Sequence, residues 1–134
     1  MEILKNLEVI EIKYNSIASL PKSIVNLEKL RELKLINNQL TLLPYEIGKL
    51  KIHEIINVQN NFISSLLKSI GNLEKLKILN FSINNLTSIP DEVGNFKNLE
   101  ELKIYGNEIT NLPKSLGNLV KKIKSVILRQ ILKI

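Results

Sequence analysis

The sequence predicts an α/β solenoid, a curved stack of short repeating units, and three observations support this prediction. Apolar residues return along the 134-residue chain with a period of 23 residues, and such self-similarity is typical of repeat architectures. One segment of each unit alternates apolar and polar residues with the period of a strand. Proline and glycine recur at fixed places in the rest of the unit, where they favour a short turn over a long helix.

Five units follow one another in register, at residues 4–26, 27–49, 50–72, 73–95 and 96–118. Each unit reads approximately L-x-x-L-x-x-L-x-L-x-x-N-x-L-x-x-L-P-x-x-I-G-x, and we number its positions 1 to 23. Positions 1, 4, 7, 9, 14, 17 and 21 are apolar in 34 of 35 cases, and His53 is the exception. We therefore expect one domain over residues 1–134.

The L-x-L segment at positions 7 to 9 predicts a short strand whose leucines face inward. Strands that return at a fixed offset run parallel, so the units together predict one parallel sheet. Proline at position 18 begins a helical turn where its missing N–H is harmless, and glycine at position 22 ends that turn in a left-handed conformation. These residues are Pro21, Pro44, Pro90 and Pro113, and Gly48, Gly71, Gly94 and Gly117. We expect short helical or 3₁₀ turns on the convex side, which make the stack curve.

An asparagine occupies position 12 of every unit, directly after the predicted strand. These residues are Asn15, Asn38, Asn61, Asn84 and Asn107. An amide at a sharp turn can bond main-chain groups of its own unit and of the adjacent unit. We therefore expect the five asparagines to form an interior ladder along the stack.

The two ends of the chain depart from the repeat. Residues 119–134 lack the asparagine and the proline, but a one-residue shift restores apolar positions at Val120, Ile123, Val126 and Leu128. We interpret this segment as a degenerate sixth strand that caps the stack, and an amphipathic helix remains an open alternative. Only three residues precede the first unit, so we expect an uncovered first strand and weak self-association through its edge.

The repeated pattern, clearest in LEKLRELKLINNQLTLLPYEIGK at Leu27–Lys49, resembles the leucine-rich repeat family. The period and the LPxxIG segment are similar to a bacterial subfamily with tandem 23-residue repeats. This resemblance implies a horseshoe-like arc that binds a protein through its concave sheet, and bacterial members imply recognition of a host protein. Some bacterial members carry a cysteine-dependent ubiquitin ligase domain, which is not carried over because the chain has no cysteine.

Positions 6, 8 and 10 of each unit should face the concave side, because positions 7 and 9 face inward. The central units place apolar and amide side chains there, whereas the outer units place charges, and this is the anatomy of a protein-binding surface. The predicted binding face consists of Val9, Ile36, Ile55, Asn57, Gln59, Ile78, Asn80, Ser82, Lys103 and Tyr105. We expect Ile55 and Ile78 to be exposed neighbours; alternatively, exposed isoleucines carry no function.

The composition argues against catalysis and metal binding. The chain has no cysteine, which excludes a disulfide, a thiolate zinc site and a cysteine nucleophile. Its single histidine, His53, replaces a core leucine, and we interpret it as a partly buried core residue rather than a proton-transfer group. Because the carboxylates are scattered over variable positions, we expect no enzyme activity, no cofactor, no metal and no small-molecule substrate.

The net charge of +6 is concentrated at one end. Residues 119–134 carry five basic residues and no acid. They lack interleaved aromatic residues, so we do not expect binding to nucleic acid or to a membrane surface. The chain shows no signal-peptide pattern and no long apolar stretch. We expect a soluble cytoplasmic protein; a secreted protein whose signal has been removed fits equally well.

Overall fold

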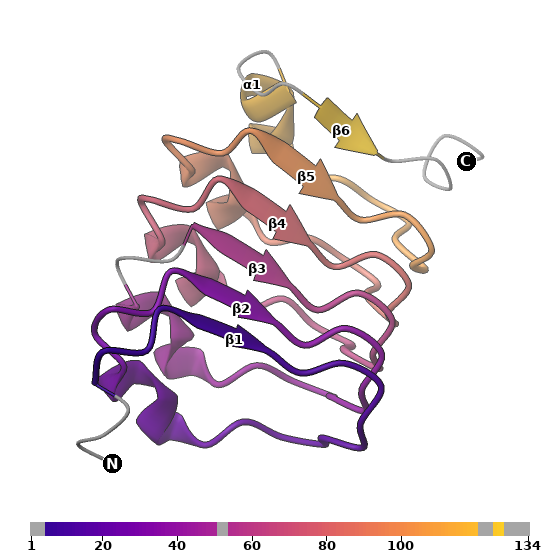
Figure 1. Cartoon of the computed structure of the whole chain (residues 1–134). Helices are drawn as coiled ribbons and strands as arrows, with labels where there is room; N and C mark the ends of the chain where they lie inside the picture. Colours follow the sequence, from indigo (N-terminus) through magenta and orange to yellow (C-terminus); the bar gives the residue numbers. More distant parts are fainter. Residues whose placement is uncertain (1–4, 51–53, 121–124, 128–134) are drawn as a thin grey trace.

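Parallel strands form one sheet in the order of the sequence (Figure 1). A computed structural model describes residues 5–50, 54–120 and 125–127. Its strands are β1 (Val9–Glu11), β2 (Glu32–Lys34), β3 (Ile55–Asn57), β4 (Ile78–Asn80), β5 (Glu101–Lys103) and β6 (Ser125–Ile127). Because β1 to β5 begin at the same position of successive 23-residue units, the predicted parallel sheet and its strand positions are confirmed.

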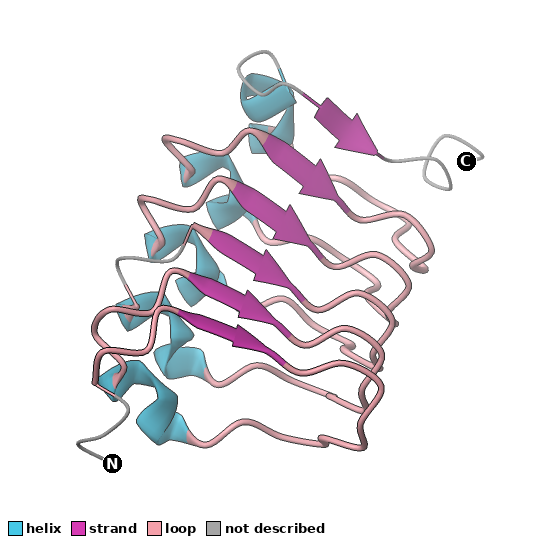
Figure 2. Ribbon diagram, in the orientation of Figure 1, coloured by secondary structure: helices cyan, strands magenta, loops and turns pink. Residues whose placement is uncertain are grey.

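Between strands, the chain returns through short helices that stack in a second row (Figure 2). These are the 3₁₀ helices η2 (Lys22–Asn26), η3 (Tyr45–Lys49), η4 (Lys68–Asn72) and η5 (Asp91–Asn95), and the α-helix α1 (Ser115–Val120). The residue before each 3₁₀ helix is extended and its carbonyl accepts the N–H of position 21, as between Pro44 and Ile47 at 3.0 Å. Leu67 adopts the same conformation and makes the same bond, so the third unit forms its turn without proline.

The inward side chains of strands and turns make one continuous apolar core. The central strand residues Leu33, Ile56, Leu79 and Leu102 are fully or almost fully buried. Burying such a side chain stabilises the fold by about 1.5–3 kcal/mol. The equivalent residue of the first unit, Ile10, is only partly buried, so the core is best protected in the middle of the stack.

The asparagines at position 12 join each unit to the one before it. The Asn84 side-chain amide donates to the carbonyl oxygen of Val58 in the preceding unit at 3.1 Å, and to Phe81 at 3.0 Å. Its oxygen accepts the backbone N–H of Ile63 at 3.0 Å. Asn38, Asn61 and Asn107 repeat this arrangement, accepting an N–H 21 residues earlier and donating to a carbonyl 26 residues earlier.

Asn15 differs from the other asparagines of position 12. It is exposed and its amide donates to Lys13 in its own unit at 2.8 Å. The other four asparagines instead bond to residues 21 and 26 positions earlier, in the preceding unit. The prediction that Asn15 belongs to the interior ladder is therefore wrong for this structure, because Asn15 is exposed and its amide bonds within its own unit.

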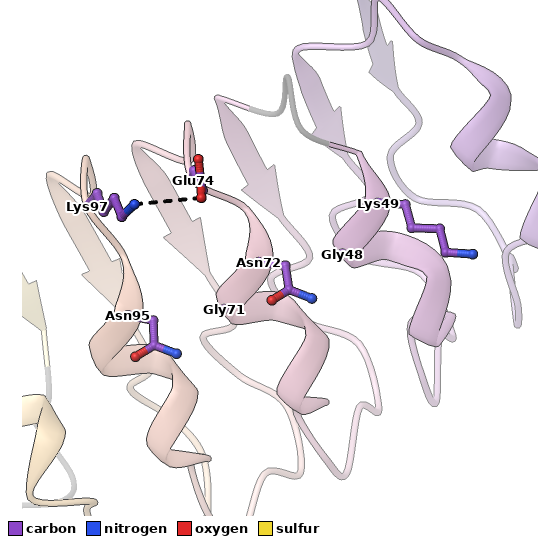
Figure 3. Close-up of a pocket in the computed structure, with 7 residues that line it drawn as sticks. All are labelled: Gly48, Lys49, Gly71, Asn72, Glu74, Asn95 and Lys97. Atoms are coloured by element: carbon purple, nitrogen blue, oxygen red, sulfur yellow. Dashed lines mark ion pairs between the residues drawn. The ribbon is translucent and has the colours of Figure 1, made fainter.

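The glycines at position 22 have a different role from the predicted one. None of them has a positive φ; the glycine with a positive φ is Gly106, at position 11. A Cβ at Gly71 would instead lie 2.5 Å from the carbonyl oxygen of Glu92, and one at Gly48 would lie 2.4 Å from that of Ser69. At Gly48 and Gly71 the backbone of the next unit thus approaches so closely that only glycine fits. Figure 3 shows both glycines on the stacked turns.

The last described strand continues the sheet with a changed spacing. β6 begins 24 residues after β5, and the register places Val126 beside Leu102. This is the one-residue shift expected from the sequence, so residues 125–127 are a strand rather than part of a helix. The rest of the predicted cap, at 121–124 and 128–134, lies outside the described residues, and so does His53.

Replacing Gly71 by alanine tests the close approach between units. We expect Gly71→Ala to lower the free energy of unfolding by about 1–3 kcal/mol, the usual cost of forcing extra atoms into a packed site. Gly117→Ala is the matched control, since a Cβ there meets nothing within 4 Å and alanine favours the helix α1. Equal denaturation midpoints for the two variants would contradict the claim that the close backbone contact at Gly71 excludes a Cβ.

Candidate functional site

The sheet register arranges the outward side chains of β2 to β5 into two rows. One row consists of Glu32, Ile55, Ile78 and Glu101, and the other of Lys34, Asn57, Asn80 and Lys103. The two central strands thus carry isoleucine and asparagine, and each flanking strand carries glutamate and lysine. The charges are placed symmetrically around an uncharged centre.

Hydrogen bonds tie the central amides to the sheet and to one another. The Asn57 side-chain oxygen accepts the N–H of Gln59 at 3.1 Å, and that of Asn80 accepts the N–H of Ser82 at 3.0 Å. The Asn80 amide also donates to the Gln59 side-chain oxygen at 3.1 Å. These bonds hold the Asn80 side chain along the sheet and link β4 to the segment after β3.

Burial on this face differs from the prediction in four residues. Ile55 and Ile78 are half-buried rather than exposed, because each lies in register between side chains of two adjacent strands. Asn80 and Ser82 are buried. Asn80 is turned along the sheet by its bonds, and the small Ser82 lies between the larger residues at the same repeat position.

The remaining residues of the predicted binding face are accessible. Val9 is exposed, and the other members are half-buried: Ile36, Asn57, Gln59, Lys103 and Tyr105. The structure thus brings Ile55, Asn57, Gln59 and Ile78 together as the accessible centre of the sheet, and Val9 lies apart on the edge strand β1.

Charged side chains at β1 and β2 are paired within the face. Lys34 lies 3.1 Å from Glu32 on β2, and Lys13 lies 2.7 Å from Glu11 beside β1. The hydrogen bond and the charge of Lys13 lower the pKa of the Glu11 carboxyl. The same pair raises the pKa of the Lys13 ammonium. Glu11 and Lys13 therefore both keep their charge at neutral pH.

Position 11 of each unit adopts the left-handed conformation at the end of the sheet face, which the sequence reasoning missed. Tyr14, Asn37, Asn60 and Ile83 have φ between 55° and 58°. Asparagine tolerates this conformation, and the Asn60 amide donates to the side-chain oxygen of Asn37, but a β-branched residue is strained there. Ile83 is nevertheless 42% exposed. Gly106 makes room for it, since a Cβ there would lie 3.0 Å from Ile83 Cγ1.

Other surfaces offer less for chemistry. One pocket lies over the ends of η3, η4 and η5, and Figure 3 shows its lining of glycine backbone, Lys49, Asn72, Asn95 and the Glu74–Lys97 ion pair. Within the described residues, no group of three or more histidine, cysteine, aspartate or glutamate side chains could hold a metal ion. The described residues also contain no helix that is long and apolar enough to cross a membrane.

Replacing Ile83 tests the strain at position 11. We expect Ile83→Asn to raise the free energy of unfolding by about 1 kcal/mol, because it relieves part of the left-handed penalty of about 1–2 kcal/mol. The reciprocal change Asn60→Ile should lower stability, since it adds the strain and removes the bond to Asn37. Chemical denaturation of both variants measures the effect, and a less stable Ile83→Asn variant would contradict this account.

Comparisons with known proteins agree with the geometry of the sheet. A family model described as "Leucine-rich repeat region" matches residues 26–126. A leucine-rich repeat protein of Leptospira interrogans superposes with a TM-score of 0.82 at 36% identity, over 92% of this chain and 31% of that one. A search of curated proteins finds no match.

Two further solved structures are similar to this chain. The plant peptide hormone receptor RGFR1, in complex with RGF2, has a TM-score of 0.85 at 29% identity, over 92% of this chain and 20% of the receptor. PEPR1, in a structure with AtPEP1, has a TM-score of 0.79 at 28% identity, over 93% of this chain and 18% of that one. This chain spans less than a third of each of the three structures. With its 23-residue units, parallel sheet and asparagine ladder, the chain belongs to the leucine-rich repeat family.

Proposed function

We propose that this protein binds a protein partner through the concave face of its sheet, with the centre of β3 and β4 as the contact. The observation that supports this proposal most is the uncharged strip of Ile55 and Ile78, which is framed by Glu32 and Glu101. Apolar side chains at the centre and charges at the rim are the usual anatomy of a protein interface.

The half-buried amides give this face a second means of recognition. Asn57 and Gln59 are partly accessible, and an amide both donates and accepts hydrogen bonds. Such groups beside an apolar strip can pair with the backbone of a partner while its side chains contact the isoleucines. The function that we propose is non-enzymatic protein binding that uses no cofactor. Its partner is a protein and not a small-molecule substrate, a nucleic acid or a membrane.

Related structures support this type of function. RGFR1 is a peptide hormone receptor, and its structure is that of a complex with RGF2. The resemblance to bacterial 23-residue repeats, together with the Leptospira structure, favours a bacterial protein whose partner is a host protein. The identity of the partner and its use of the concave face are both part of the proposal.

Two lysines at the centre of the face test the proposal. In Ile55→Lys/Ile78→Lys, the new charges lie in register with Glu32 and Glu101, so we expect the free protein to stay folded by circular dichroism. A partner on this face should lose at least tenfold in affinity, because binding would bury unpaired ammonium groups. The measurement is capture from cell extract on immobilised protein, followed by titration of the captured protein.

The matched control places two lysines on another surface. Leu42 and Tyr45 are exposed apolar residues near η3, so Leu42→Lys/Tyr45→Lys has the same charge change away from the sheet. We expect this control to bind like the wild type. Loss of binding in the control alone, with the concave variant unaffected, would place the binding site elsewhere.

Self-association through β1 is the alternative function. β1 is the edge strand of the sheet, and its Val9 is exposed. Sedimentation of the wild type over a range of concentrations separates the two functions. A concentration-dependent dimer that Ile55→Lys/Ile78→Lys leaves intact supports an assembly role, whereas a monomer that captures a partner supports the concave face.

A further inference from the structure

In the sequence, two positions of the repeat that precede the strand form columns of charged residues. One member, Lys51, lies outside the described residues. Position 2 reads Lys5, Glu28, Lys51, Glu74 and Lys97, and position 5 reads Glu8, Arg31, Glu54, Lys77 and Glu100. The sign alternates from unit to unit in both columns, and within each unit the two positions carry opposite signs. All ten residues are charged, even though positions 2 and 5 are not among the positions that define the repeat.

The structure places the position-5 residues directly on top of one another. Backbone bonds run from the N–H of Arg31 to the carbonyl of Glu8 at 2.8 Å, and from Glu54 to Arg31 at 2.6 Å. The same bonds join Lys77 to Glu54 at 2.8 Å and Glu100 to Lys77 at 2.7 Å. The side chains of this column are therefore held at the spacing of adjacent strands, close enough to attract or repel.

Ion pairs between units follow from this stacking. The Arg31 guanidinium lies between two carboxylates, 3.3 Å from Glu8 and 3.4 Å from Glu54. In the position-2 column, Lys97 lies 3.7 Å from Glu74 (Figure 3). Each of these pairs joins two successive units, so the charges act across the contacts between repeats and not within one repeat.

We propose that the two columns form an alternating-charge code. The charge order of a repeat is the sign at position 2 followed by the sign at position 5, and the code makes each repeat stack specifically on a repeat of the opposite order. The apolar positions are nearly the same in all units, so packing alone discriminates poorly between a neighbouring repeat and a repeat two places away. Repeats two places apart carry the same charge order, and stacking them would bring like charges together. The code thus favours stacking in sequence order, independently of what the concave face binds.

Exchanging the two charged residues of the second unit, which leaves the amino-acid composition unchanged, tests this proposal. Glu28→Arg/Arg31→Glu leaves the net charge unchanged but gives the second repeat the charge order of the first and third. We expect Tm to fall by about 5 °C, and 1 M NaCl should narrow the gap to the wild type because it shortens the screening length to about 3 Å.

A rescue variant shows whether the lower Tm comes from the charge order or simply from the lost contacts of Glu28 and Arg31. Adding Lys5→Glu/Glu8→Arg to the exchange restores opposite order between the first two repeats, and we expect it to recover about half of the lost Tm. The proposal is overturned if the fourfold variant is no more stable than the double variant, or if salt leaves the gap unchanged.

If the double variant does not fold, Lys5→Glu/Glu8→Arg alone is measured; it reverses one contact, and an unchanged Tm would equally overturn the proposal.

Discussion

The asparagine ladder is the interaction on which the rest of this fold depends. A solenoid turns its backbone sharply after every strand, and buried main-chain groups at such turns are costly unless they are bonded. Asn61 and Asn84 satisfy these groups in two successive units at once, because each amide bonds carbonyls of its own unit and of the one before it. The ladder thus provides the bonds that the turns need and joins each repeat to the one before it.

The close spacing of the repeats explains several features elsewhere in the molecule. At the turns, the backbone of one unit lies so near the next that a Cβ on Gly48 or Gly71 would clash with a carbonyl oxygen. On the sheet, it brings Ile55 beside Ile78 and half-buries both. At the strand entries, it stacks charged side chains at the spacing of strands. The candidate binding face and the charge columns therefore share one structural cause.

The fold could be predicted from the sequence because every unit repeats the same apolar positions. An irregular residue in one unit does not obscure the strand and turn positions, since the other units show where they lie. The burial of Asn80 could not be predicted, since it depends on a side-chain bond to Gln59 in the neighbouring unit. The burial of Ser82 could not be predicted either, since it depends on the larger residues beside it in the adjacent units. The role of Gly71 was missed for a similar reason: the contact that requires it comes from the following repeat. The alternating charges were readable in the 23-residue register, but they lie outside the consensus positions that identify the repeat.

Denaturation of two asparagine variants tests the central claim most directly. Asn84 is buried and bonded to two units, whereas Asn15 is exposed and bonds within its own unit. The account predicts that Asn84→Ala lowers the free energy of unfolding by about 1–3 kcal/mol, because it leaves buried main-chain groups unpaired. Asn15→Ala should change it by less than about 0.5 kcal/mol. Equal losses for the two variants, or no loss for Asn84→Ala, would contradict the claim that the ladder holds the repeats together.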